Sequence, residues 1–216
     1  MAEPRGSANH AREVAHYAIP LGISPGVVVS FCRERARRRT FVVLCPTRYP
    51  TDGGSQVTNS GQSLLGPSFY WASFNDTSGV ADNGHLILGG QRPPFSLVGR
   101  PGQLWPRPGQ PHPVQQLNVP RWRFTPNQGG VRYVAERPAT VLRDATVGGR
   151  PALVLVAPPY PDGGLMGGHV IVVWNSGGHG YLLSLHFEAA PGRTYTLAER
   201  TAAALAVANS FKPVTL

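Results

Sequence analysis

Two histidines and a serine in the C-terminal third of the chain could perform chemistry on a shared surface. Ser184 and His186 lie two residues apart in the run YLLSLHF, and His169 begins the preceding apolar run HVIVVW. If the two runs form a hairpin that turns at Gly177 and Gly178, His169 lies directly opposite His186, with Cβ atoms about 5 Å apart. Two imidazoles at that spacing can share one metal ion, and a serine hydroxyl on the same face can act as a nucleophile.

A metal site on His169 and His186 would need a third protein ligand, because catalytic zinc sites usually present three. His179, Asp162 or His85 could supply it only if the fold brings one of them close. Without a recognisable ligand spacing, we expect structural histidines that are capped by backbone groups or water. The sequence therefore predicts no cofactor, and a metal ion on His169 and His186 is the alternative.

A nucleophilic triad can be written from Ser184, His186 and Asp162. Residues two apart on one strand point the same way without necessarily touching, and the chain has no G-x-S-x-G nucleophile elbow. The Gly-rich segments PDGGLMGGH and NSGGHG lack the lysine and the strand–loop–helix context of a phosphate-binding loop. The sequence favours a protein without catalytic activity, and a metal-dependent or serine hydrolase that uses His169, Ser184 and His186 is the alternative.

The elements that must position these residues are four apolar runs between Ala139 and Phe187. Gly, Asn and Asp separate the runs, a pattern typical of an antiparallel meander. A turn at Gly177 and Gly178 places one set of side chains on one face of the last hairpin, and both faces are mostly apolar. The hairpin should therefore be central in the sheet and covered on both sides. The predicted pairs on the first face are Trp174–Tyr181, Val172–Leu183 and Val170–Leu185, and those on the second face are Ile171–Ser184, Val173–Leu182 and His169–His186.

Two helices are predicted to pack on this sheet. Thr196 and Glu199 have the capping-box spacing, followed by an Ala-rich C-terminal helix. Ser24 and Pro25 have the residue types of an N-cap and a first helical position. They predict the start of an N-terminal helix, which should run to about Arg38. The fold class is α+β, an antiparallel sheet with N- and C-terminal helices and long Pro/Gly-rich loops. The residues predicted to face the sheet are Leu197, Thr201, Ala204, Leu205, Ala208 and Phe211 in the second helix and Val27, Val28, Phe31 and Cys32 in the first.

The rest of the chain is predicted to form one domain over residues 17–216, after a poorly ordered polar tail over residues 1–16. We expect a strand from Thr40 to Leu44, which stops at Cys45-Pro46. A long loop from Pro46 to Pro67 should follow. The runs SFYWASF (68–74) and GHLILGG (84–90) should pair and extend the sheet. Residues 91–130 should be irregular, because their many prolines exclude long helices and central strands.

Cys32 and Cys45 are the only two cysteines in the chain. One is expected on a helix face and the other at the end of the next strand, which is compatible with a bridge between the two elements. Closing a loop of about 14 residues would stabilise the fold by about 3 kcal/mol in the chain-entropy model. Two buried thiols are the alternative.

The chain is basic, with a net charge of +9, and 19 of its 20 basic residues are arginine. A basic surface can attract nucleic acid, anionic lipid or an acidic envelope polymer. The arginine run from Arg33 to Arg39 can be a solvated helix end or a patch for an anionic polymer, including nucleic acid. Aromatic and arginine side chains also alternate in the Pro-rich segment, where they could stack on sugars or bases or simply cap the edge of a core. The candidate ligand surface consists of Trp105, Arg107, Arg121, Trp122, Arg123 and Phe124.

The sequence contains no segment of about 20 apolar residues that could cross a membrane. The N-terminal residues also lack the apolar core of a secretory signal peptide. The protein is therefore cytoplasmic unless a leader has been removed.

The stretch from Ala139 to Val214 resembles the end of PsbP-like α+β domains. The resemblance rests on GGRPALVLV, VIVVWN, GYLLSLHF and ALAVANSFKPV. The segment FCRERARRRTFVVLCPTRYP and the later Gly-Gly-His-Val are also similar to uncharacterised exported proteins of high-GC bacteria. These resemblances imply an extracytoplasmic or cell-envelope binding or structural module without catalytic activity. Its partner would be an anionic envelope polymer or another protein, and nucleic acid is the less favoured partner.

Overall fold

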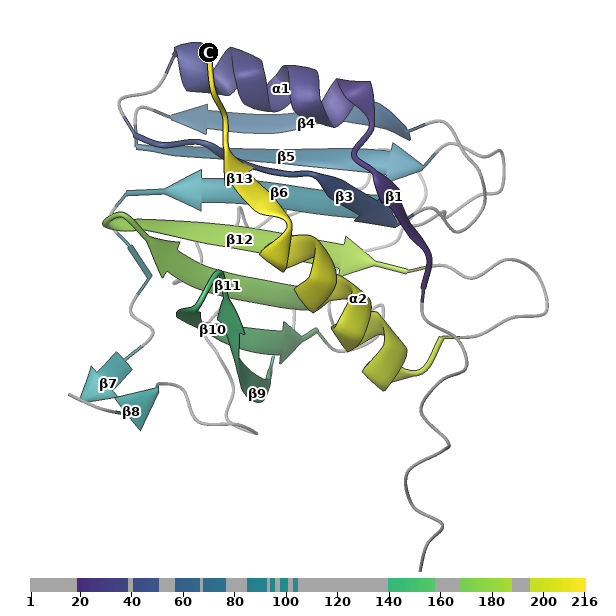
Figure 1. Cartoon of the computed structure of the whole chain (residues 1–216), viewed down its shortest axis with the longest axis vertical. Coiled ribbons are helices and arrows are strands. Elements are labelled where there is room, and N and C mark those ends of the chain that lie inside the picture. Colours follow the sequence, from purple (N-terminus) through teal and green to yellow (C-terminus); the bar gives the residue numbers. More distant parts are fainter. Residues whose placement is uncertain are drawn as a thin grey trace, which may run out of the picture.

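A computed structural model describes residues 19–38, 41–50, 57–66, 68–76, 85–92, 94–95, 98–100, 103–104, 140–157, 168–187 and 195–216. Its framework is a seven-stranded sheet in which every neighbouring pair is antiparallel (Figure 1). Two helices lie on the sheet, so the predicted α+β class is confirmed. The strands, in spatial order, are β4 (Val57–Gly66), β5 (Phe69–Asp76), β6 (His85–Gln91), β12 (His179–His186), β11 (Val170–Ser176), β10 (Arg150–Val156) and β9 (Thr140–Val147).

The β11–β12 hairpin has the register that the sequence predicts, with Trp174 opposite Tyr181 and Ile171 opposite Ser184. Gly177 and Gly178 make the turn with φ values of 58° and 78°, which lie in the left-handed region that glycine adopts without steric cost. β12 is the central strand because it also pairs with β6 on its other side. The predicted pairing of the runs at 68–74 and 84–90 is confirmed as β5 and β6.

The two faces of this sheet bury different sets of side chains. Helix α1 (Gly26–Arg37) and helix α2 (Leu197–Asn209) lie on the same face, which we call the helix face (Figure 1). On that face Trp174 stacks on Tyr181, with ring centroids 5.8 Å apart, and meets the edge of Phe211. The opposite face carries His169 and Ser184, and we call it the histidine face. Its apolar side chains are buried too, as predicted for a hairpin covered on both sides; they include Trp71, Ile87, Leu153, Leu155, Ala157, Ile171, Val173 and Leu182.

Helix α2 begins with the predicted capping box. The backbone N–H of Glu199 donates to Oγ1 of Thr196, and the backbone N–H of Thr196 donates to Oε2 of Glu199. Small side chains then let the helix approach β11 and β12 closely. Its buried residues are Thr201, Ala203, Ala204, Val207 and Ala208, whereas the predicted contacts Leu197 and Leu205 are only partly buried.

Helix α1 starts one residue later than predicted, because Pro25 is its N-cap and no side chain caps it. Ser24, the predicted N-cap, instead donates its backbone N–H to the carbonyl oxygen of Thr47 and its hydroxyl to that of Arg48. These bonds tie the start of the helix to the neighbouring strands. The predicted buried side, Val28, Phe31 and Cys32, is confirmed, while Val27 is partly buried.

The prediction of a strand from Thr40 to Leu44 is wrong in its bounds. The strand is β2 (Leu44–Pro46), and Pro46 sits at its last position, paired with Phe211 of β13 (Phe211–Pro213). Phe41 is buried outside the ladder, where its ring stacks on Tyr70 with centroids 5.9 Å apart. β2 pairs only with β13, so a proline is tolerated there.

The prediction of a loop from Pro46 to Pro67 is also wrong, because the segment contains two strands. β3 (Arg48–Pro50) pairs with β1 (Leu21–Ile23), and β4 forms one edge of the large sheet. β4 has the Thr, Asn, Ser and Gly composition of a loop, but an edge strand needs pairing on one side only. Its register shift between Asn59 and Ser63 is typical of edges.

The remaining boundary predictions fall largely outside the described residues. The predicted tail over residues 1–16 lies outside them, as does most of the Pro-rich segment over residues 91–130. Within that segment, β7 (Val98–Arg100) and β8 (Gln103–Leu104) form a short two-stranded sheet. In the described part of the chain, neither helix has the length and apolarity to cross a membrane.

Candidate functional site

The histidine face brings the predicted polar residues together at one end of the β11–β12 hairpin. Nδ1 of His169 and Oγ of Ser184 are hydrogen-bonded at 2.7 Å. The His169 and His186 rings lie side by side, with centroids 5.2 Å apart and planes inclined by 47°. The sequence-based hypothesis that these two imidazoles converge is therefore correct.

Backbone contacts hold the corner that carries His169. Gly168 has a φ of 74°, a left-handed conformation that glycine adopts readily. Its carbonyl oxygen accepts a hydrogen bond from Nη1 of Arg200 on α2, at 3.0 Å. The carbonyl oxygen of His169 accepts one from the backbone N–H of Ala157, also at 3.0 Å. Neither Gly168 nor Arg200 was predicted from the sequence, because a hydrogen bond between residues 32 positions apart leaves no local pattern.

Burial decides which chemistry this group can perform. His169 and Ser184 are fully buried and His186 is half-buried. A serine nucleophile needs an approach path for its substrate, which a fully buried hydroxyl does not offer in this conformation. Asp162, the third member of the proposed triad, lies outside the described residues. The triad of Ser184, His186 and Asp162 therefore stays a prediction, and the described partner of Ser184 is His169.

The candidates for a third metal ligand are separated by the fold. His179 is at the opposite end of β12 from His186, about 23 Å away at the usual rise of a strand, so it cannot join them. His85 of β6 is the backbone partner of His186. Among the residues whose side chains the structure describes, no group of three His, Cys, Asp or Glu could hold a metal ion.

His179 takes part in a different cluster, beneath the segment that joins α1 to β2. Its ring lies against Phe41, with centroids 5.0 Å apart. Burial, with a smaller contribution from the charge of Arg92, holds the pKa of His179 below its usual value of 6.5. On the same strand, burial raises the pKa of Tyr181 to about 12, and its hydroxyl donates to the carbonyl oxygen of Val42 at 2.7 Å. These contacts fasten the α1–β2 connection to the sheet.

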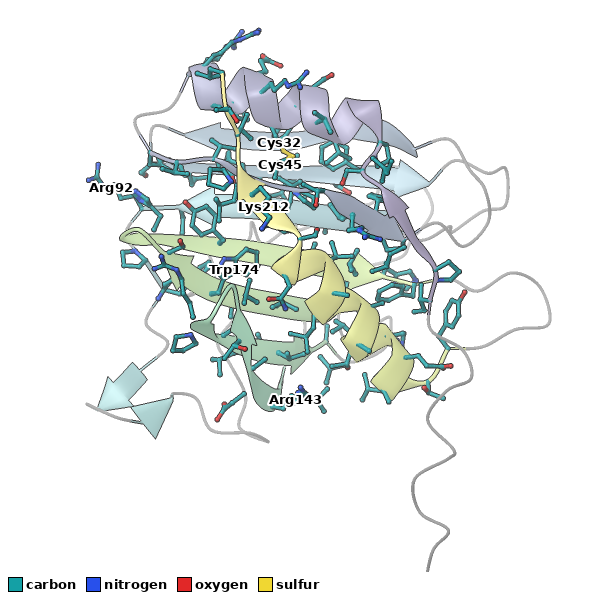
Figure 2. All side chains as sticks on the ribbon, viewed as in Figure 1. Cys32, Cys45, Arg92, Arg143, Trp174 and Lys212 are labelled. Carbon is teal, nitrogen blue, oxygen red and sulfur yellow. A yellow bond between two sulfur atoms is a disulfide. The ribbon has the colours of Figure 1, made fainter. Side chains whose placement is uncertain are left out.

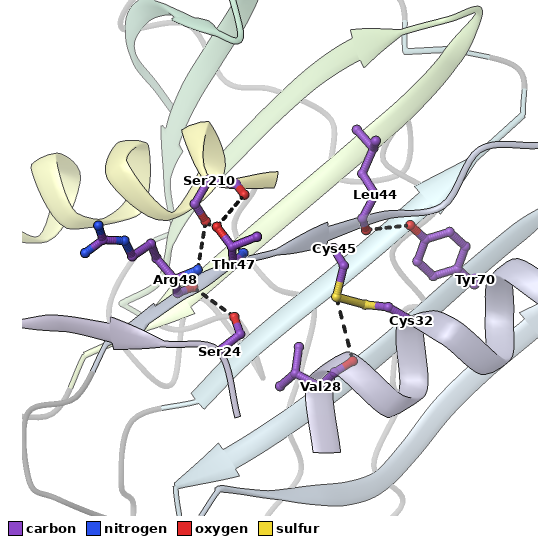
Figure 3. The surroundings of a disulfide bond; sticks show 9 residues. All are labelled: Ser24, Val28, Cys32, Leu44, Cys45, Thr47, Arg48, Tyr70 and Ser210. Carbon is purple, nitrogen blue, oxygen red and sulfur yellow. Dashed lines mark hydrogen bonds between the residues drawn. A yellow bond between two sulfur atoms is a disulfide. The ribbon is translucent and has the colours of Figure 1, made fainter. Parts of the chain in front are cut away.

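Cys32 and Cys45 form the predicted disulfide, which joins α1 to β2 inside the core (Figure 3). Sγ of Cys45 lies 3.8 Å from the carbonyl oxygen of Val28 on the preceding turn of the helix. On the far side of the same strand segment, Thr47 donates its hydroxyl to the carbonyl oxygen of Ser210 at 3.0 Å. The bridge and this hydrogen bond connect both helices through one short stretch of chain.

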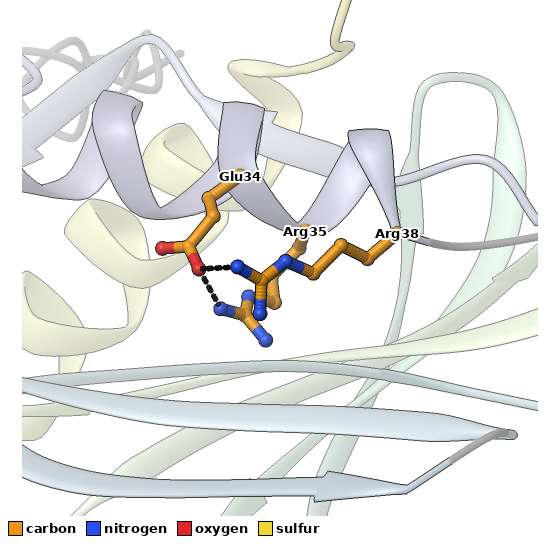
Figure 4. Close-up of polar contacts among 3 residues, drawn as sticks. All are labelled: Glu34, Arg35 and Arg38. Atoms are coloured by element: carbon orange, nitrogen blue, oxygen red, sulfur yellow. Dashed lines mark hydrogen bonds and ion pairs between the residues drawn. The ribbon is translucent and has the colours of Figure 1, made fainter.

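Helix α1 presents an arginine-rich surface in its last two turns. Glu34 is its one acidic residue, and Oε1 of Glu34 accepts hydrogen bonds or ion-pair contacts from Arg35 at 2.6 Å and Arg38 at 3.2 Å (Figure 4). Arg35 is buried, and its guanidinium lies 5.3 Å from the centre of the Phe31 ring. The run is therefore not simply a solvated helix end. The spacing of Phe31 and Arg35, four residues apart, was the available signal for this contact.

Arg33 and Arg37 are exposed on the same helix, one turn apart, and no described ion pair involves either of them. Arg35 and Arg38 already neutralise Glu34, so the positive charge of Arg33 and Arg37 is available to an external anion. The other predicted ligand surface lies outside the described residues; it consists of Trp105, Arg107, Arg121, Trp122, Arg123 and Phe124.

Comparisons with known proteins give this chain no relative from which a function could be transferred. No protein-family model, no curated protein and no solved structure matches it. The function of the chain therefore has to be inferred from its own side chains.

Proposed function

We propose that this chain is an exported or cell-envelope binding module without catalytic activity, and that its ligand is an anionic polymer of the envelope. The ligand would contact the arginine- and tryptophan-rich segment between Trp105 and Phe124, together with the exposed arginines of α1. The observation that carries the proposal is the charge arrangement on α1. The helix has one acidic side chain, Glu34, and its charge is already neutralised by neighbouring arginines.

The spacing of Arg33 and Arg37 supports a polymeric anion. Side chains four residues apart on a helix lie about 5–6 Å apart at Cβ, and two like charges there destabilise the helix by a few tenths of a kcal/mol. An anion that contacts both arginines removes that repulsion. The exposed positions of the last turns carry no large apolar side chain that would insert into a membrane.

The framework beneath this surface supports a role outside the cytoplasm. Disulfides persist in oxidising compartments and are uncommon in the cytosol of mesophiles. The Cys32–Cys45 bridge fixes α1 to β2, and the burial of Arg35 and Phe31 anchors the same turns. A helix held in this way presents its exposed arginines at fixed positions, which lowers the entropic cost of binding.

The test is retention on immobilised long-chain polyphosphate as a function of salt. We expect the double substitutions Arg33→Gln/Arg37→Gln and Trp105→Ala/Trp122→Ala each to weaken binding, and the first to reduce the salt slope by about one per arginine. The matched control is Arg143→Gln/Arg150→Gln, which removes the same charge from exposed residues of the β9–β10 hairpin, at the opposite edge of the sheet from α1 (Figure 2).

Three results would contradict the proposal. The first is equal loss of binding in the control, which would show an attraction to net charge alone. The second is unchanged binding in both test variants. The third is tighter binding to single-stranded DNA, or to vesicles that contain phosphatidylglycerol, than to polyphosphate, which would assign a different partner.

A second candidate, a hydrolase on the histidine face, is favoured by one observation, the 2.7 Å hydrogen bond between His169 and Ser184. A general base within hydrogen-bond reach of a hydroxyl is the starting geometry of nucleophilic catalysis. A screen with esterase and phosphatase substrates tests it. Activity that Ser184→Ala abolishes would replace the binding proposal, and no activity above that of Ser184→Ala would eliminate the hydrolase.

A further inference from the structure

Glu34 of α1 is the counterion of two arginines whose surroundings differ. Its Oε1 accepts a hydrogen bond from Nη2 of Arg35 at 2.6 Å and lies 3.2 Å from Nη2 of Arg38 (Figure 4). The side chain of Arg35 is 7% exposed, whereas that of Arg38 is 66% exposed. One carboxylate therefore serves a buried and a solvated guanidinium, and its single charge can neutralise only one of them.

Burial keeps the carboxylate of Glu34 on Arg35. Removing the counterion of a buried guanidinium is strongly destabilising, because the charge is then left uncompensated away from water. In the part of the chain that the structure describes, Glu34 is the one carboxylate that pairs with Arg35. The guanidinium of Arg35 also lies against the ring of Phe31, which holds it in place. Glu34 therefore stays with Arg35 when its contact with Arg38 is broken.

Arg38 is held much more weakly than Arg35. Its ion pair with Glu34 joins two exposed side chains four residues apart. Pairs of this kind contribute so little that breaking one changes an equilibrium by only about twofold. An external anion can therefore take the place of Glu34 at Arg38 at small cost, and Arg35 still neutralises the displaced carboxylate.

Arg38 also borders the arginines of the proposed ligand surface. Residues four apart form rows along a helix, and the row of Glu34 and Arg38 lies next to the row of Arg33 and Arg37. All four of these side chains are exposed. An anionic chain that lies along Arg33 and Arg37 therefore meets Arg38 beside them, with the carboxylate of Glu34 as its competitor.

We infer that Glu34 controls how many arginines of α1 the anionic polymer contacts: it competes with the polymer for Arg38, which becomes a third contact when an anion displaces the carboxylate. This inference rests on the proposed function, because it concerns the same ligand and the same helix. Glu34 thus has two roles, as the permanent counterion of Arg35 and as an exchangeable partner of Arg38.

The test is a double-mutant cycle of Glu34→Gln and Arg38→Gln in the full chain, measured as retention on immobilised polyphosphate as a function of salt. Arg38→Gln should weaken binding and lower the salt slope by about one. Glu34→Gln should tighten binding by about twofold, because the competing carboxylate is gone. In a chain that already carries Arg38→Gln, the further change Glu34→Gln should give no gain, because Arg35 neutralises that carboxylate.

The matched control is Asp144→Asn, which makes the same change of charge at an exposed residue of β9, at the opposite edge of the sheet from α1. It should bind polyphosphate as the unmodified chain does. Glutamine at position 34 keeps a side-chain oxygen that can accept the hydrogen bond of Arg35, and melting temperatures check that each variant folds. Arg38 is exposed, so Arg38→Gln is the variant least expected to disturb the fold, and it tests the third contact by itself.

Three results would overturn the inference: an unchanged salt slope in Arg38→Gln, a gain in Asp144→Asn equal to that in Glu34→Gln, or a gain from Glu34→Gln that persists without Arg38. The proposed function fails separately, when Arg33→Gln/Arg37→Gln binds polyphosphate as tightly as the unmodified chain. Weaker binding in that variant together with unchanged binding in Arg38→Gln would overturn this inference alone.

Discussion

The two faces of the β11–β12 hairpin are equally buried but differ in chemistry. On the helix face, residues such as Trp174 and Leu183 pack against α2 and β13, and the fully buried side chains of the hairpin are all apolar or aromatic. On the histidine face, equally buried aliphatic side chains share the surface with His169 and Ser184. Burial of a polar group costs free energy unless it is hydrogen-bonded. Packing alone accounts for the buried side chains of the helix face, whereas on the histidine face the hydrogen bond between His169 and Ser184 offsets the cost of burying polar groups.

Neighbouring leucines of β12 provide the sharpest test of this comparison. Leu183 is fully buried on the helix face, and Leu182 is 2% exposed on the histidine face. We expect Leu183→Ala and Leu182→Ala each to lower the free energy of unfolding by about 2–5 kcal/mol, the usual cost of removing a buried leucine. Urea unfolding measures both. A cost below about 1 kcal/mol for Leu182→Ala alone would show that the histidine face is open to solvent.

The disulfide lies among the side chains that pack on the helix face. Replacing both Cys32 and Cys45 by alanine should lower the free energy of unfolding by about 3 kcal/mol, because the unfolded chain regains the entropy of the closed loop. Unfolding with and without a reducing agent measures the same quantity in the unmodified chain. The reducing agent should have no effect on the double variant, and an equal effect there would contradict the assignment.

The hydrogen bond on the histidine face should contribute less. Ser184→Ala removes the hydroxyl at Nδ1 of His169, and we expect a loss of about 1–3 kcal/mol, the range for a buried polar group that loses a partner. Denaturant unfolding of the variant and of the unmodified chain measures this difference. Unchanged or increased stability would mean that the bond contributes nothing to the fold.

The smallest expected effect comes from His179 and appears as a pH dependence. Its pKa in the folded chain is below the usual value of 6.5, so the unfolded chain binds a proton more readily. The contribution of His179 to stability is therefore full above pH 6.5 and is lost as the pH falls through the lower folded pKa. Melting temperatures between pH 5 and 8 should fall less steeply toward acid in His179→Gln. Identical pH profiles would contradict the buried environment of this ring.

The elements with strong local signals could be predicted from the sequence. The paired glycines fixed the turn and therefore the register from Val170 to Leu185, and the Thr196–Glu199 spacing located the start of α2. The position of β6 beside β12 could not be predicted, because a pairing between strands some 90 residues apart has no local pattern. That pairing sets the backbone of His85 opposite that of His186, which only the fold could show.

Composition led to wrong predictions for two strands, each of which pairs with a single neighbouring strand. β4 has the composition of a loop but forms a strand at the sheet edge, and β2 contains Pro46. Both strands pair on one side only, so their ladders tolerate residues that a central strand excludes. The sequence could not show which arginines of α1 are buried. Arg35 is buried whereas Arg33 and Arg37 are exposed, because only Arg35 lies on the side of the helix that packs on the core.

Retention on immobilised polyphosphate as a function of salt concentration tests the proposed function most directly. The exposed charges of Arg33 and Arg37 predict that Arg33→Gln/Arg37→Gln binds more weakly than the unmodified chain, with a salt slope smaller by about one per arginine. Retention equal to that of the unmodified chain, or an equal loss in Arg143→Gln/Arg150→Gln, would contradict the account.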